Sequence, residues 1–184
     1  MVKTYLGAND LAIAFPPSLR PDAIVACATF PAVRALGQSF SVRLRDQVIT
    51  IPRRLHLETD FIHLESLTVL QREIVDCLLT RHSDGFTRQK HLERIVGVNH
   101  GWIPPFVVQL AGEYVVQIMD VIYEHLPSLD KQSYKEFLCA NPGFLDLTER
   151  RVISYWDCYY RNVRRDDYVG FKILEFFRSL SSPV

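Results

Sequence analysis

The spacing of hydrophobic residues changes near residue 65. Before this point short runs of alternating apolar and polar residues are separated by turns, and five of the ten prolines lie there. After it, apolar residues recur every three or four positions. Alternation is typical of half-buried strands, and the longer spacing is typical of amphipathic helices. The pattern predicts a mainly helical α+β protein, organised as a single domain over residues 1–184, with a β and loop part at 1–65 and a helical part at 66–184.

A β-hairpin is the clearest element of the first part. In the stretch SFSVRLRDQVITIP, Phe40, Val42 and Leu44 alternate with polar residues, and apolar residues resume at 48–51 after the polar turn RDQ. Alternation on both sides of a polar turn is the usual signature of a hairpin. The apolar run at 24–30 fits either a third strand or a short buried helix, because a run this short does not distinguish the two.

Six helices are predicted after residue 65. The first begins at Thr68, which with Gln71 has the spacing of a capping box, and the second covers 86–97 and ends at Gly97. Of the later helices, one follows Asp130 as its N-cap, one begins at Asp146 with Glu149 in capping-box spacing, and the last covers about 166–180.

The remaining helix, at about 104–125, is the most apolar element and is predicted to be central. Pro104 and Pro105 suit a first helical turn. At about 100° per residue its polar residues fall in one arc about 80° wide, namely Gln109, Glu113, Gln117, Asp120 and Glu124. A membrane span needs about 20 apolar residues without such a stripe. We therefore expect the other helices and the hairpin to pack around this helix, and we expect no membrane partner.

Charge and cysteine usage narrow the classes of function. Lysine plus arginine and aspartate plus glutamate both number 21, whereas proteins dedicated to nucleic acids usually carry excess positive charge. The four cysteines are widely spaced among apolar or aromatic neighbours, which is typical of free thiols in a reducing compartment. The first apolar run is interrupted by Asn9 and Asp10, unlike a secretory signal. We therefore expect a cytoplasmic protein, for which nucleic acid is not the expected partner.

Candidate chemistry is sparse. Glu113 is the candidate catalytic carboxylate, because a desolvated carboxylate on the long helix would be an acid or a base; the alternative is a carboxylate at the water edge or one paired with Arg81 or Arg88. Tyr155 and Tyr159, on the helix near 148–161, are candidate ligand-binding residues together with Arg81 and Arg88. The alternative for the tyrosines is core packing, because an aromatic stripe at helical spacing is usually buried.

Two other patterns are weaker. The segment 81–94 is rich in arginine, lysine and histidine and could bind nucleic acid or phosphate, although a solvated charged face is the favoured interpretation. Residues 56–65 contain two histidines and three carboxylates, but lack the spacing of HExxH or of a facial triad. We therefore predict no metal and no cofactor.

Four stretches together carry a resemblance: IPRRLHLE, VDCLLTRHSDGF, WIPPFVVQLAGEYVVQI and VISYWDCYYR. Over about residues 40–178 the chain resembles a family of bacterial proteins to which no function is attached. This resemblance implies a bacterial cytosolic origin and brings no activity, substrate or catalytic residue with it.

Three function classes follow from the sequence. The favoured class is a non-enzymatic interaction or structural protein, with itself or another protein as partner, because the core is large, the charge is balanced and no catalytic set is assembled. A hairpin edge offers a route to a homo-oligomer by strand pairing. The alternative is an enzyme or small-ligand protein with a pocket around Glu113 and the Tyr155–Tyr160 helix, and the second alternative is nucleic-acid or phosphate binding through 81–94.

Overall fold

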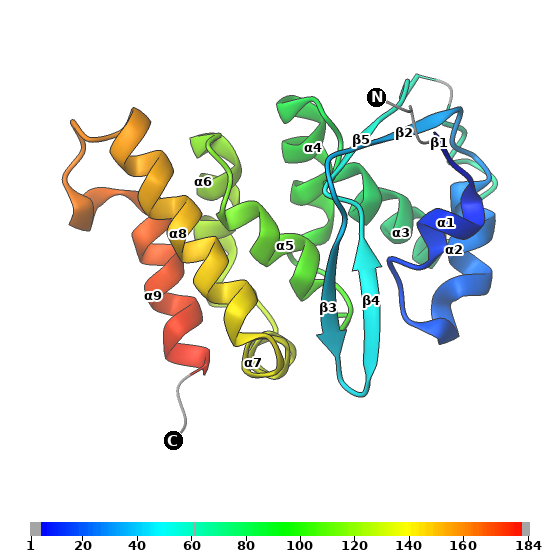
Figure 1. The fold of residues 1–184 in the computed structure, drawn as a ribbon. Helices are drawn as coiled ribbons and strands as arrows, with labels where there is room; N and C mark the ends of the chain where they lie inside the picture. Colours follow the sequence, from blue (N-terminus) through cyan, green and yellow to red (C-terminus); the bar gives the residue numbers. More distant parts are fainter. Residues whose placement is uncertain (1–4, 61, 182–184) are drawn as a thin grey trace. The chain divides into compact units, whose positions relative to one another are not determined.

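The computed structural model describes residues 5–60 and 62–181 of the chain. The contacts within it divide the chain into two compact units, Met1–Ile95 and Val96–Val184. Within the described residues the elements are nine α-helices, three short 3-10 turns and five strands (Figure 1). The predicted class, a mainly helical α+β fold, is confirmed.

The N-terminal unit combines two small antiparallel sheets with four helices. The first sheet has the strand order β1-β2-β5, and the second consists of β3 and β4. The strands are β1 Tyr5–Leu6, β2 Val33–Leu36, β3 Phe40–Leu44, β4 Gln47–Ile51 and β5 Arg54–His56. The helices are α1 Ala8–Ala12, α2 Arg20–Cys27, α3 Val69–Leu79 and α4 Gly85–Ile95, with the 3-10 turn η1 at Pro17–Leu19.

The predicted hairpin is confirmed as β3 and β4 (Figure 1). Its register pairs Val42 with Ile49 and Phe40 with Ile51. Val42, Ile49 and Ile51 are buried, whereas Val48 lies on the exposed face. The turn places Arg45 at φ 54°, the left-handed region that closes tight hairpins.

The N-terminal part is more helical than the sequence indicated, because residues 1–65 also contain α1 and α2. The undecided run at 24–30 begins as the end of α2, in which Ala23, Ala26 and Cys27 are buried while Ile24 and Val25 are exposed. The three-residue interval between the buried positions Ala23 and Ala26 follows the helical period. Short alternating runs between prolines therefore concealed these two helices.

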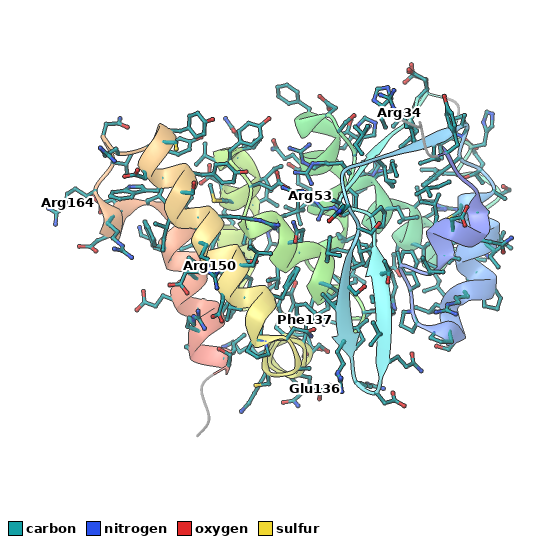
Figure 2. The ribbon with its side chains drawn as sticks, viewed as in Figure 1. Arg34, Arg53, Glu136, Phe137, Arg150 and Arg164 are labelled. Carbon is teal, nitrogen blue, oxygen red and sulfur yellow. The ribbon has the colours of Figure 1, made fainter. Side chains whose placement is uncertain are left out.

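The C-terminal unit is entirely helical in its described residues, and α5 is its centre. Its elements are α5 Pro104–Ala111, α6 Val116–His125, α7 Lys131–Ala140, α8 Pro142–Tyr159 and α9 Val169–Ser181, with 3-10 turns η2 Leu126–Ser128 and η3 Arg165–Asp167. Every residue of α5 is buried, and α5 packs against α6, α7, α8 and α9. Aromatic contacts fill the space between helices, such as Phe137 of α7 against Phe144 of α8, with ring centroids 5.6 Å apart. Phe137 is labelled in Figure 2.

The predicted helix at 104–125 is two helices, since the chain leaves the helical path between Gly112 and Val115. Gly112 ends α5 with φ −92° and ψ 28°. Glycine inside a helix costs about 1 kcal/mol relative to alanine. The β-branched residues Val115 and Val116, three and four positions later, also have low helix propensity. The Tyr160 hydroxyl donates to the carbonyl oxygen of Tyr114 at 3.0 Å, which satisfies a backbone group outside the helix. Local propensity and this tertiary contact together break the helix.

The start of α8 also differs from the prediction. The helix begins at Pro142, and only Asn141 separates it from the end of α7 at Ala140. The Asn-Pro-Gly sequence that ends one helix therefore also begins the next. Asp146 and Glu149 therefore lie inside α8 and do not form the predicted capping box. Both carboxylates accept hydrogen bonds from Arg178 of α9 instead. None of the described helices is long and apolar enough to cross a membrane.

Candidate functional site

Helices α3 and α4 form a hairpin whose two beginnings are capped by side chains. The Thr68 hydroxyl accepts from Gln71 N at 3.2 Å, and Gln71 Oε1 accepts from Thr68 N at 3.1 Å, which confirms the predicted capping box. At the start of α4, Asp84 Oδ2 accepts from Thr87 N at 2.7 Å. This hydrogen bond lowers the pKa of Asp84 below its ordinary value. Both helices therefore begin at fixed residues, which sets the register between them.

The connection between these helices is tied to strand β5. Leu55 N donates to the carbonyl oxygen of Arg81 at 2.8 Å, and Ser83 N donates to the carbonyl oxygen of Leu55 at 2.7 Å. The buried His82 accepts from Asp84 N at Nδ1 (3.0 Å) and, as the Nε2–H tautomer, donates to the carbonyl oxygen of Leu57 at 3.0 Å. These hydrogen bonds fix the turn between α3 and α4 against strand β5.

A buried acid–base cluster spans the hairpin. We call Asp76 of α3 and His91 and Arg94 of α4 the Asp76 cluster. His91 Nδ1 lies 2.5 Å from Asp76 Oδ1, and Arg94 Nη1 lies 3.3 Å from the same oxygen. The side chains of Asp76 and His91 are 11% and 7% exposed, whereas Arg94 is 43% exposed. Asp76 is therefore held between a buried imidazole and a guanidinium that reaches water.

Two cavities adjoin the Asp76 cluster. The smaller, of about 240 Å³, is lined by His91 and Arg94 together with Thr59, Asp60, Ile62, Leu64, Leu79, Thr87 and Lys90. The larger and more open one, of about 460 Å³, is lined by Asp76 and Arg94 together with Leu64, Glu65, Val69, Arg72 and Glu73. Arg94 and Leu64 border both cavities. Asp76 thus lines the larger cavity, His91 lines the smaller one, and Arg94 lines both.

The contact with Asp76 orients the imidazole of His91. A carboxylate only accepts hydrogen bonds when it is ionised, so Nδ1 of His91 carries the proton that it shares with Asp76. The second ring nitrogen, Nε2, then accepts a hydrogen bond in the neutral form and donates one in the protonated form. His91 is one of the residues that line the smaller cavity.

The buried thiols of this unit are poor nucleophiles. Burial raises the pKa of Cys77, the neighbour of Asp76, well above its ordinary value, and the nearby carboxylates raise it further. Burial likewise raises the pKa of Cys27 to about 12. Because the thiolate is the reactive form, these cysteines act as apolar packing.

The site residues predicted from the sequence do not assemble into one site. Glu113 lies in the C-terminal unit, in the break between α5 and α6, and is buried at 3% exposure. Arg81 and Arg88 lie in the N-terminal unit, and both are fully buried. Arg88 Nη1 donates to the carbonyl oxygens of His82 and Ser83, each at 2.9 Å, and so stabilises the turn before α4. A catalytic role for Glu113 and ligand binding by either arginine stay predictions.

The two tyrosines lie on α8 in the C-terminal unit. Tyr155 is half-buried between Tyr114, at 6.0 Å between ring centroids, and Tyr159, at 6.3 Å. Tyr159 is exposed. The stripe is therefore a surface row rather than a buried one, and ligand binding by these tyrosines stays a prediction.

The predicted basic segment 81–94 contains His91 and Arg94, but their contact with Asp76 was not predicted, although a signal for it exists. Asp76 lies seven residues before Ser83, and His91 lies seven residues after Asp84. In two antiparallel helices joined at this turn, positions equally far from it face each other. Thr87, Lys90, His91 and Arg94 also share one face of α4, because their spacing follows one helical stripe. Helical spacing alone places Asp76 on the polar face of its helix, together with Arg72 four residues before it, and does not show that another helix covers this face.

In the part of the chain that the structure describes, no group of three or more histidine, cysteine, aspartate or glutamate side chains is placed to hold a metal ion. Comparison of the chain with protein-family models, with curated proteins and with solved structures finds no match. The predicted resemblance to a bacterial family therefore stays a prediction, and inferences about function come from the geometry of the site.

Proposed function

We propose that this protein binds a small anionic molecule in the 240 Å³ cavity of its N-terminal unit. One observation carries the proposal: Asp76 fixes the imidazole of His91, and the same imidazole shares a cavity with Lys90 and Arg94. A cavity with two cations and one oriented imidazole suits a carboxylate or phosphoryl group.

The balance of charge in the cavity favours an anion. Two permanent cations, Lys90 and Arg94, line the cavity against one carboxylate, Asp60, while Asp76, which is not among the lining residues, contacts Arg94 and His91. Lys90 has no hydrogen bond or ion pair within the described residues, and Arg94 has the single contact with Asp76 there. The remaining guanidinium N–H groups of Arg94 can therefore bind a second acceptor, for which arginine offers a fork of two parallel hydrogen bonds.

The volume of the cavity limits the size of the ligand. A space of 240 Å³ lies just below the range of about 300–1,000 Å³ that is usual for drug-sized ligands. It corresponds to the liquid volume of about eight water molecules. An inorganic phosphate or a short carboxylic acid fits this space, whereas a dinucleotide does not.

Calorimetric titration tests this proposal with inorganic phosphate and malonate as separate probes. At least one probe should bind wild-type protein, and Arg94→Gln should weaken its binding by about tenfold or more, since hydrogen bonds between charged groups contribute roughly 1.5–3 kcal/mol. Lys90→Gln, on an exposed residue, should weaken binding less. The imidazole nitrogen NMR signals of His91 should also shift when the probe is added.

Arg72→Gln is the matched control, since it removes the same charge from the residues that line the larger cavity. It should leave the affinity unchanged. Equal losses in Arg72→Gln and Arg94→Gln, or no binding of either probe at millimolar concentration, would contradict a site at His91.

The cavity changes the order of preference that the sequence suggested. Balanced charge and the lack of a catalytic motif favoured an interaction protein over a small-ligand protein. The Asp76 cluster supports small-ligand binding, at a place different from Glu113. The proposal assigns no reaction to the cluster. Self-association stays a prediction, for which the exposed tyrosines Tyr114 and Tyr159 are the supporting observation.

A further inference from the structure

The three-stranded sheet of the N-terminal unit has one buried and one open face. Leu6 pairs with Val33, and Ala35 pairs with Leu55, so these side chains point to the same side. Val33 and Leu55 are buried, which identifies this side as the core face. Because side chains alternate along each strand, the residues between them point to the opposite side.

The open face presents a row of three side chains that we call the cross-strand row: Tyr5, Arg34 and His56. Tyr5 of β1 is the direct partner of Arg34 in β2, and Arg34 is the direct partner of His56 in β5. Adjacent strands lie about 4.8 Å apart, so the row spans about 10 Å. Tyr5 is 60% exposed, His56 is exposed and Arg34 is half-buried. An exposed aromatic ring, a half-buried arginine and an exposed imidazole thus stand side by side on this face.

Two arginines lie on this face, Arg34 and Arg54, because Arg54 and His56 are two residues apart in β5, whereas Arg43 and Arg45 belong to the hairpin of the other sheet. Residues 33–56 contain five arginines and one acidic residue, Asp46. Strands β1, β2 and β5 themselves carry no acidic residue, and Glu58 follows β5 by two positions. The zero net charge of the chain therefore hides a basic segment. Arg34 and Arg53, two of the five arginines, are labelled in Figure 2.

The members of the row retain hydrogen-bonding capacity. Arg34 Nε is buried and has no partner among the described residues, which makes it a donor without an acceptor. His56 Nδ1 lies 3.0 Å from the hydroxyl of Ser83, and the His56 ring stacks at 6.5 Å from that of His82. These contacts fix the His56 ring at the edge of the row.

We propose that the cross-strand row binds single-stranded nucleic acid. The rings of Tyr5 and His56 supply surfaces on which unpaired bases stack, and the guanidinium of Arg34 between them binds a phosphate. A duplex keeps its bases stacked on one another, so a row of this kind favours a single strand. This site is distinct from the anion cavity at His91 and extends the function beyond it.

Fluorescence anisotropy with a labelled twelve-nucleotide oligouridine, titrated at several salt concentrations, tests this proposal. Wild-type protein should bind it, with affinity that falls as salt rises. Tyr5→Ala should weaken binding by about 5- to 140-fold and leave the salt dependence unchanged, since stacking is not ionic. Arg34→Gln should reduce the slope of log affinity against log salt by about 0.7, the loss of one phosphate contact on a single strand.

Two controls keep the result specific. Arg164→Gln removes the same charge from the C-terminal unit, where Arg164 is exposed (Figure 2), and should change neither affinity nor slope. Tyr5→Phe keeps the ring and should retain binding. The proposal would be overturned by absence of oligouridine binding at low salt, by equal losses in Arg34→Gln and Arg164→Gln, or by equal binding of a duplex or of polyglutamate.

Discussion

Two helix pairs, one in each unit, are each joined by an arginine of the second helix that contacts a carboxylate of the first, but the two carboxylates differ in burial. In α3 and α4, Arg94 in the last turn of the second helix contacts Asp76 of the first. In α8 and α9, Arg178 in the last turn of the second helix contacts Asp146 and Glu149 of the first. The Asp76 side chain is 11% exposed, whereas that of Asp146 is 45% exposed. The two carboxylates therefore differ in burial, and the buried one has His91 as an additional partner.

The difference decides what each cluster can do. An exposed ion pair contributes about 0–1 kcal/mol, since water competes for both partners. A buried carboxylate needs hydrogen-bond partners, and Asp76 has His91 and Arg94 as its partners. The contact with Asp76 also orients the His91 ring, which lines the smaller cavity. In the C-terminal unit the helices are held by packing instead, with Gly170 of α9 against Val152 of α8. One pair therefore orients a buried imidazole, and the other holds two helices together by close packing.

The largest effect is expected at Gly170. A Cβ at this position would lie 2.7 Å from Tyr168 Cε1 and 2.8 Å from Val152 Cγ1, closer than real Cβ contacts. Val152 is fully buried and cannot move away without cost. Overpacking of a core costs about 1–3 kcal/mol, so Gly170→Ala should lower the free energy of unfolding by about 3 kcal/mol. Urea denaturation measures this loss.

Gly143→Ala is the matched control, because Gly143 lies in α8 and a Cβ there meets nothing within 4 Å. Alanine is the better helix former, so this variant should be as stable as wild type or up to about 1 kcal/mol more stable. A Gly170→Ala variant with unchanged stability would show that the C-terminal unit is not held by this close packing.

Removal of each of the two carboxylates in turn is expected to give the second-largest loss of stability. Asp76→Ala leaves the Nδ1–H of His91 without its buried acceptor, which costs about 1–3 kcal/mol. Asp146→Ala removes an exposed contact, and Glu149 still pairs with Arg178, so it should cost less than about 1 kcal/mol. Thermal denaturation of both variants compares these costs. Equal losses would mean that burial does not separate the two clusters.

The same contrast explains what the sequence could predict. The hairpin at 40–51, the helix after Thr68 and the helix after Asp130 follow from local spacing and capping, and all three are confirmed. The break at Gly112 was not foreseen, because a hydroxyl 46 residues away captures the carbonyl of Tyr114. The Asp76 cluster was missed for a related reason. Helical periodicity gives the face on which a polar residue lies, but tertiary packing decides whether another helix covers that face.

The residues that precede α4 and α8 also differ in how they cap these helices, and the smallest loss of stability is expected from changing them. Asp84 accepts from Thr87 N at the start of α4, whereas Asn141 before α8 makes no side-chain cap hydrogen bond. The hydrogen bond lowers the folded-state pKa of Asp84, so its stabilisation is present above the unfolded value, near 3.9, and is lost as pH falls through the folded value. Asp84→Ala should thus cost about 1 kcal/mol at pH 7 and less at pH 2. Urea denaturation at both pH values measures the change, with Asn141→Ala as the control that does not titrate. A cost for Asp84→Ala that is independent of pH would show that the ionised carboxylate is not what stabilises the start of α4.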